Sequence, residues 1–272
     1  MRIDLHRAAR LPRLVTRPLR FAHRGASARA PENTLAAFRE AVRLGADAVE
    51  CDVHLSRDGV PVILHDDTVD RTTDGRGAVA RLTLAEIRRL DAGAWFASRF
   101  RGERVPTLEE TLDFARGRCG LNLEIKGPDR GRRAPDAADP RAAAAAVARV
   151  LRRSRYRDYL VLSSFSAEAI LALRAALPRA RLGLLASRSL RGVRSLHRRA
   201  GLHALHPHVR LASRRRVRLA RDLGLRIYFW TVNDAALARR LLLLGCDGLM
   251  TDDPALFDGI PGLARRWASA RR

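Results

Sequence analysis

The chain has 272 residues, of which 47% are hydrophobic and 30% charged, and it carries a formal net charge of +23. This composition excludes a disordered or low-complexity chain, and the length suits one large α/β barrel or two small domains, of which one domain is favoured because no low-complexity linker divides the middle. The charge would attract nucleic acid, anionic membranes or phosphate-bearing substrates. Arginine is spread over nearly every predicted helix, however, so we interpret the charge as a solvated basic surface.

The N-terminal segment, residues 1–18, is predicted to be a basic arm ahead of the fold. It lacks the apolar core of a signal peptide, and no apolar stretch in the chain is long enough to span a bilayer. The three cysteines, Cys51, Cys119 and Cys246, are isolated from one another and lie in or beside apolar runs. We therefore expect buried thiols in a reducing compartment and a cytoplasmic protein.

From residue 19 onward, short apolar runs alternate with amphipathic stretches. Leu35, Phe38 and Val42 form the stripe of a first helix, and Gly45 is its expected stop. Further helices are predicted at 108–115, 141–151, 167–176, 213–223 and 235–244. Strands are predicted at 19–23, 46–55, 121–125, 159–163, 182–185, 203–205, 226–231 and 248–251. Eight strands separated by helices predict an α/β fold, a TIM (β/α)8 barrel over residues 19–272.

One connection is longer than the others, residues 56–106. It opens with an Asp58-Gly59 turn, which is a hairpin signal between two strand-like runs. The sequence therefore predicts a small insertion after the second strand. In such barrels the loops after the strands form the active-site face.

Strand alternation places three acidic side chains inside the barrel: Glu50, Asp52 and Glu124. Carboxylates in close contact would repel one another by roughly 4 kcal/mol per pair at an effective dielectric of about 20. Oxygen ligands without thiolates or clustered imidazoles favour one divalent cation, Mg²⁺ or Ca²⁺. The alternative is that arginines of neighbouring strands neutralise the acids, or that one acid is protonated.

Basic and imidazole side chains accompany these acids. Lys126 is the only lysine of the chain and shares the inward parity of Glu124. A compact ammonium beside carboxylates does what the planar guanidinium of arginine cannot. His23 ends the first strand and His65 ends the return strand of the insertion, so both can reach one barrel mouth. Two imidazoles beside a bound phosphate can supply a base and an acid near neutral pH.

Several segments together resemble the glycerophosphodiester phosphodiesterase family, in order from about residue 21 to 253. They are His23-Arg-Gly-Ala, Pro31-Glu-Asn-Thr34, Gly45-Ala-Asp-Ala-Val-Glu-Cys-Asp-Val53, His65-Asp66, Arg71-Thr-Thr73, Val105-Pro-Thr-Leu108, Leu121-Asn-Leu-Glu-Ile-Lys126, Ser163-Ser-Phe165, Trp230-Thr-Val-Asn233 and Thr251-Asp252.

This resemblance implies a TIM-type barrel that hydrolyses glycerophosphodiesters to glycerol 3-phosphate and an alcohol, with a divalent metal. It also implies roles for nine residues of this chain. His23 and His65 match the acid/base pair, and Glu50, Asp52 and Glu124 match the metal ligands. Substrate-binding positions are matched or suggested at Arg24, Lys126, Trp230 and, in the insertion, Phe96.

Two other functions stay open at this point. One is lysophospholipase D-type hydrolysis of lysophospholipids at an anionic membrane surface, with weak membrane association through the basic arm. The other is noncatalytic binding of polyanions, which the net charge alone would support. An aromatic content of 5%, without interleaved basic and aromatic residues, argues against specific nucleic-acid binding. The released alcohol, the choice between Mg²⁺ and Ca²⁺, the identity of the base, the nucleophile and the oligomeric state are left undecided.

Overall fold

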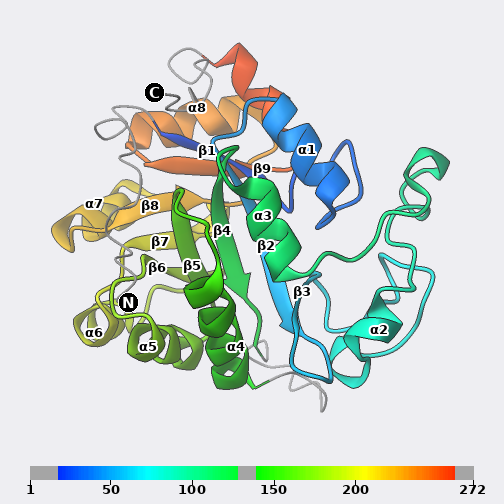
Figure 1. Cartoon of the computed structure of the whole chain (residues 1–272). Coiled ribbons are helices and arrows are strands. Elements are labelled where there is room, and N and C mark those ends of the chain that lie inside the picture. The colour runs from blue at the N-terminus through cyan, green and yellow to red at the C-terminus, as the bar shows by residue number, and fades with distance from the viewer. Residues whose placement is uncertain (1–17, 128–138, 261–272) are drawn as a thin grey trace.

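Eight parallel strands close into a barrel in the computed structural model, which describes residues 18–127 and 139–260 (Figure 1). The barrel order is β1-β2-β4-β5-β6-β7-β8-β9, and β9 pairs back with β1 to close it. The strand bounds are Leu19–His23 (β1), Ala48–Leu55 (β2), Gly120–Ile125 (β4), Leu160–Ser164 (β5), Leu182–Ala186 (β6), Ala204–Pro207 (β7), Arg226–Phe229 (β8) and Gly248–Thr251 (β9). This confirms the predicted TIM barrel, and the eight barrel strands fall where the sequence predicted them, within two residues at each end.

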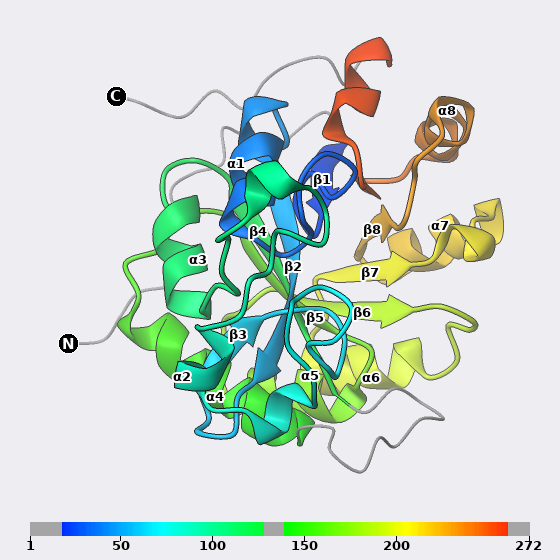
Figure 2. The same ribbon diagram turned by 90° about the vertical axis from the view of Figure 1, so that its right-hand side faces the viewer.

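Helices cover the outside of the barrel, as Figures 1 and 2 show from two directions. Their bounds are Leu35–Arg43 (α1), Leu84–Ile87 (α2), Leu108–Ala115 (α3), Pro140–Arg153 (α4), Ala167–Ala176 (α5), Val193–Ala200 (α6), Arg214–Asp222 (α7) and Ala235–Leu244 (α8). The longer helices begin at side-chain caps such as Thr34, Ser166 and Asp234, whose oxygens accept backbone N–H groups of the first turn. No bounds were predicted for α6, a two-turn helix that buries Val193, Leu196 and Ala200.

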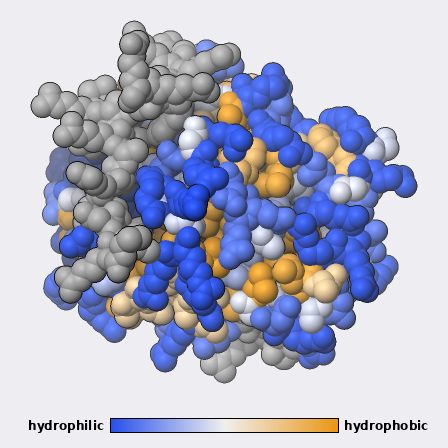
Figure 3. All heavy atoms as spheres, in the orientation of Figure 1, coloured by the Kyte–Doolittle hydropathy of each residue, from blue (hydrophilic) through white to orange (hydrophobic). Residues whose placement is uncertain are grey.

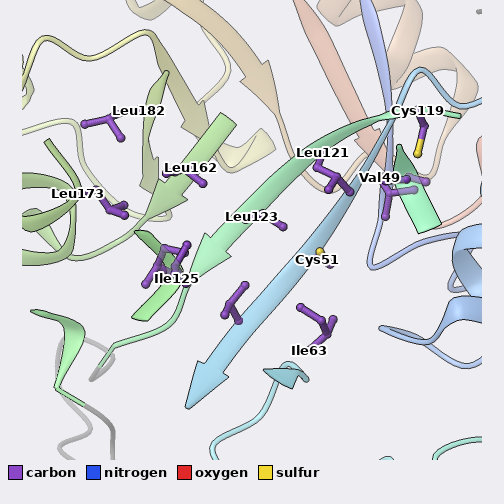
Figure 4. Packing of buried hydrophobic residues seen from close by; sticks show 14 of the residues in the cluster. Val49, Cys51, Ile63, Cys119, Leu121, Leu123, Ile125, Leu162, Leu173 and Leu182 are labelled. Atoms are coloured by element: carbon purple, nitrogen blue, oxygen red, sulfur yellow. The ribbon is translucent and has the colours of Figure 1, made fainter. Parts of the chain in front are cut away.

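The two faces of each strand have different environments. Outward residues of β2 and β4 such as Val49, Cys51 and Leu123 pack under the helices in the main apolar cluster (Figure 4). Inward residues near the strand starts, including Phe21, Val161 and Tyr228, form a second cluster that fills the lumen. The lumen is therefore a packed core at one end. Its other end, where the strands finish, carries polar side chains.

The predicted insertion is present after β2. Ser56 and Val60 close the hairpin turn through three hydrogen bonds, and Gly59 in it has a φ of 76°, which suits glycine. A short strand, Pro61–Ile63 (β3), returns antiparallel to β2. The rest of the insertion holds α2 and short 3-10 turns around an apolar cluster of its own, which includes Val69, Val79, Ile87 and Val105.

Other features bear on the sequence predictions. All three cysteines are buried and free. The face seen in Figure 1 is mainly hydrophilic, with separate apolar patches (Figure 3). Within residues 18–127 and 139–260, no helix combines the length and apolarity that crossing a bilayer requires. The predicted basic arm, apart from residue 18, lies outside the described residues.

Candidate active site

Three buried carboxylates meet at the end of the barrel where the strands finish. Glu50 and Asp52 project inward from β2, and Glu124 projects inward from β4. Asp52 and Glu124 are directly paired in the register of these two strands. One oxygen from each lies within 4.8 Å of the other two. The inward positions that strand alternation predicted are therefore the observed ones, and their oxygens are close enough to share one ion.

Asp52 receives most of the nearby positive charge. Nζ of Lys126 lies 2.8 Å from Oδ1 of Asp52 and 2.7 Å from Oε1 of Glu124. Asn33 donates to Oδ2 of Asp52 at 2.8 Å, and Nε of Arg24 lies 3.5 Å from the same oxygen. Burial by itself would raise the pKa of Asp52, but the charges of Lys126 and of its other neighbours hold that pKa well below its usual range. Asp52 is therefore an anion at neutral pH.

Glu50 is left without comparable compensation. Among the described residues its carboxylate accepts one hydrogen bond, from the backbone N–H of Arg24 at 2.9 Å, and makes no ion pair with a lysine or arginine side chain. Burial and the charge of Asp52 raise the pKa of Glu50 to about 8. The alternative considered from sequence, that neighbouring basic side chains neutralise the acids, therefore applies to part of the cluster. Glu50 still lacks a positive partner. A hard divalent cation with oxygen ligands fits this donor set.

Each of the two predicted histidines, His23 and His65, is held by a carboxylate that bonds its Nδ1. Nδ1 of His23, at the end of β1, lies 2.7 Å from Oδ1 of Asp252, just after β9. Nδ1 of His65, after β3, lies 2.6 Å from Oδ1 of Asp66. A carboxylate can only accept, so each Nδ1 carries the proton and each Nε2 remains to exchange a proton with a ligand.

Arg24 adds a positive group beside His23. Its backbone is left-handed, with a φ of 56°, and this turn directs its N–H to Glu50. Nη1 donates to Glu32 at 2.9 Å, whereas the buried Nε makes no hydrogen bond within the described residues. Its contact with Oδ2 of Asp52, at 3.5 Å, is an ion pair without a hydrogen bond, so the guanidinium still offers positive charge to an anionic oxygen in the adjoining cavity.

The acids, histidines and cations surround one cavity of about 640 Å³. His23, Arg24, Glu50, Glu124 and Lys126 line it, and His65 lines its edge toward the insertion. Asp52 lies beneath this lining, bonded to Lys126. Seven predicted site residues therefore belong to one polar constellation.

The two predicted aromatic positions differ. Trp230, at the end of β8, lines the cavity and meets Phe165 edge to face at 5.7 Å between ring centroids. Phe96 is not among the residues that line the cavity. It packs instead between Trp95 and Phe100 in the insertion, with centroids 5.7 and 5.6 Å away. Local aromatic packing holds Phe96 outside the constellation that contains Trp230.

Sequence reasoning gave no role to several residues that complete the site. Asp252 and Asp66 hold the histidines, and Asn33 holds Asp52. Asn122 lines the cavity floor, and neither amide atom has a partner among the described residues. A signal existed for two of them, since Asp66 follows His65 directly and the inward parity of Asn122 equals that of Glu124. The pairing of Asp252 with His23 depends on barrel closure and has no local signal.

Comparison with known proteins identifies the family. Residues 23–256 match the model of the glycerophosphoryl diester phosphodiesterase family. The chain belongs to this family.

Relatives in the family match over most of their length. The chain is 36% identical over 234 residues to a glycerophosphodiester phosphodiesterase of Caldanaerobacter subterraneus, covering 86% of this chain and 93% of the relative. It is 32% identical over 258 residues to a glycerophosphodiester phosphodiesterase of Bacillus subtilis, covering 89% and 85%. A solved phosphodiesterase of Oleispira antarctica, in complex with the product sn-glycerol-3-phosphate, superposes with a TM-score of 0.80 at 36% identity over 88% of this chain and 94% of the other.

Proposed function

We propose that the chain hydrolyses glycerophosphodiesters to glycerol 3-phosphate and an alcohol. The observation that carries this proposal is the convergence of three carboxylates and two carboxylate-supported histidines on one cavity. The family membership and the Oleispira relative, whose structure holds sn-glycerol-3-phosphate, support the same reaction. A noncatalytic polyanion-binding protein would have no need of this buried arrangement.

Glu50, Asp52 and Glu124 would hold one divalent cation, Mg²⁺ or Ca²⁺. Both ions prefer oxygen ligands, and all three side chains offer carboxylate oxygens within reach of one another. When bound, the ion supplies Lewis-acid polarisation of a nonbridging phosphoryl oxygen. Lys126 pairs with both Asp52 and Glu124 and fixes their positions.

His23 and His65 would exchange the protons of the reaction. One Nε2 takes a proton from the nucleophile as its oxygen bonds to phosphorus. The other Nε2 gives a proton to the alcohol oxygen as its bond to phosphorus breaks. The attacking oxygen belongs to water or to the neighbouring glycerol hydroxyl, and in the second case a cyclic phosphate forms first and is then hydrolysed.

Arg24, Lys126 and Trp230 would bind the substrate. Nε of Arg24 and the ammonium of Lys126 are the cavity's positive groups, so negative charge that develops on the phosphoryl oxygens is stabilised between them. Trp230 and Phe165 form an apolar wall on the opposite strands, suited to the carbon skeleton of a substrate. Phe96 would contribute only if substrate reached the insertion's aromatic cluster.

The test is an assay of the full chain with Mg²⁺, Ca²⁺ or chelator. It is read as glycerol 3-phosphate released from glycerophosphocholine and glycerophosphoethanolamine, and as lysophosphatidic acid released from a lysophospholipid. We expect activity that chelator removes and one of the ions restores, and that Glu124→Gln abolishes. Glu109→Gln, on the outside of α3, is the matched control and should remain active. Absence of glycerol 3-phosphate from every substrate with both ions would overturn the proposal, and lysophospholipid as the only substrate would favour lysophospholipase D-type hydrolysis.

A further inference from the structure

The positive charge of the chain is distributed unevenly. Residues 169–221 contain fourteen arginines and no aspartate or glutamate, although the whole chain has 29 acidic residues. The unusual feature is the missing acids more than the number of arginines. A codon preference for arginine explains abundant arginine everywhere, but it does not explain 53 consecutive residues without a carboxylate.

This acid-free segment forms one side of the barrel. It contains the strands β6 and β7, the helix α6 and most of the helix α7. Figures 1 and 2 show that β6 and β7 are neighbouring strands of the barrel. Six exposed arginines on the two helices, which we call the α6–α7 arginine face, have no ion pair or side-chain hydrogen bond within the described part of the chain. They are Arg194, Arg198, Arg199, Arg214, Arg215 and Arg218.

Arginines on other helices are neutralised more often. Arg39 pairs with Glu103 at 2.8 Å, Arg43 with Glu40 at 2.7 Å, and Arg88 with Glu110 at 2.8 Å. The segments outside the described residues contain twelve arginines and three aspartates, so they too are basic. The α6–α7 arginine face is thus a strongly positive surface whose nearest carboxylate on these two helices is Asp222 at the end of α7, and its arginines repel one another unless counterions or a partner cover them.

The face begins at the rim of the active-site cavity. Ser187, after β6, lines the cavity, and the exposed Arg188 and Arg191 follow in the loop to α6. After β7, His208 contacts the cavity's Trp230 at 4.9 Å between ring centroids, and exposed Arg210 donates to His208. Helix α7 starts four residues later with Arg214 and Arg215. A large anionic surface bound to this face would therefore lie beside the cavity mouth.

We propose that the α6–α7 arginine face binds the surface of an anionic lipid bilayer. A bilayer offers many phosphates in a plane, which matches charged guanidinium groups spread over two neighbouring helices. Residues 169–221 contain no Phe, Tyr or Trp, so this side of the barrel offers no platform on which bases of single-stranded nucleic acid could stack. The interaction is electrostatic and should weaken steeply as salt is added.

The test measures binding of the full chain to vesicles by co-sedimentation. Vesicles of phosphatidylcholine with phosphatidylglycerol are compared with pure phosphatidylcholine, at low and at physiological salt. The face variant carries Arg194→Glu, Arg214→Glu and Arg215→Glu. All three positions are in first turns of helices, where glutamate is favourable, so the fold should be retained.

The control variant carries Arg149→Glu, Arg153→Glu and Arg155→Glu. These exposed arginines lie at the end of α4 and just after it, at the opposite end of the barrel from the mouth, and their replacement changes the net charge equally. Hydrolysis of soluble glycerophosphocholine by each variant reports separately on the proposed reaction.

We expect the parent chain to bind the anionic vesicles, the face variant to bind more than about tenfold more weakly, and the control to lose much less. The proposal is overturned if the parent chain does not bind, if both variants weaken equally, or if the face variant binds as well as the parent. Binding to single-stranded RNA but not to anionic vesicles would likewise overturn it.

Discussion

Oδ1 of Asp252 lies 2.7 Å from Nδ1 of His23. This contact links the end of β9, the last strand of the barrel, to the end of β1, the first. Burial by itself would lower the pKa of His23, but the hydrogen bond to Asp252 contributes most to raising it above its ordinary value. Asp252 therefore fixes both the orientation of the imidazole and its affinity for a proton.

Replacing Asp252 by asparagine should lower kcat by about tenfold or more, because the amide no longer supports the imidazolium form of His23. The pKa of His23 should fall, so the limb of the pH–rate profile that this histidine controls should move to lower pH. Asp253→Asn is the control, since that carboxylate pairs with Arg29 at the surface. An unchanged pH profile in the Asp252 variant would contradict the supporting role.

Alanine at His23 or at His65 should reduce turnover by about 10²–10⁴-fold, since each change removes one of two proton-exchanging groups. Circular dichroism and urea unfolding should show a retained fold. His197→Ala, on α6 away from the cavity, should keep parental activity. Substantial activity in both active-site variants would refute the acid/base assignment.

Lys126→Arg and Lys126→Met should separate charge from shape. The methionine variant leaves Asp52 and Glu124 without their shared cation, and we expect it to lose about 3–5 kcal/mol of unfolding free energy. The arginine variant keeps the charge, but its planar fork cannot occupy the point between two carboxylates. It should lose about a hundredfold in kcat with a smaller loss of stability, and near-parental activity would show that a compact ammonium is not required.

Metal binding should release a proton. In metal-free protein at pH 7 Glu50, with its pKa raised to about 8, holds a proton that an incoming cation displaces. Calorimetry in buffers of different ionisation enthalpy should therefore show close to one proton released per Mg²⁺ or Ca²⁺, and affinity should rise with pH up to about 8. Glu50→Gln should abolish the release, and a parental release of zero would contradict the role of Glu50.

The Glu50 carboxyl group should make the metal-free protein less stable as pH rises, whereas most acids in folded proteins make it more stable. Its proton is held in the folded chain up to about pH 8 but lost near pH 4.5 when unfolded. Its contribution to the stability of metal-free protein should therefore be largest at low pH and fall between these values. Saturating cation should remove that dependence in urea unfolding curves.

A buried histidine outside the acid/base pair should make the fold sensitive to acid. Burial lowers the pKa of His206 to about 3, and neither ring nitrogen has a partner among the described residues. Its ring occupies the space above Gly183, where a Cβ would lie 2.6 Å from Nε2. The unfolded chain binds a proton near pH 6.5, so this residue should cost about 1.4 kcal/mol of stability per pH unit as pH falls below 6.5. The difference in unfolding free energy between His206→Leu and the parent should shift in favour of the variant from pH 7.5 to 5, and a pH-independent difference would contradict this.

Much of the fold and the placement of the acids followed from local pattern. Alternation along a strand has a period of two, so the inward direction of Glu50, Asp52 and Glu124 could be predicted without knowing any pairing. The hairpin could be predicted because Asp58-Gly59 lies between two apolar runs. Helix α6 also has an apolar stripe, of Val193, Leu196 and Ala200, so its bounds could have been predicted from the same kind of pattern.

The remainder depends on contacts between distant parts of the chain. Asp252 reaches His23 only because β9 pairs with β1, and Asn33 reaches Asp52 through a left-handed backbone with a φ of 58°. Aromatic residues carry little directional information in sequence. Trp230 faces the cavity, whereas neighbouring rings retain Phe96 in the insertion.

The two imidazoles at the mouth belong to separately packed parts of the molecule. His23 ends a strand of the closed barrel, while His65 follows β3 at the edge of the insertion's own apolar cluster. Loosening of that cluster would carry one imidazole away and leave the barrel intact. We therefore expect heating to inactivate the enzyme at a lower temperature than the one at which the barrel melts, with recovery on cooling.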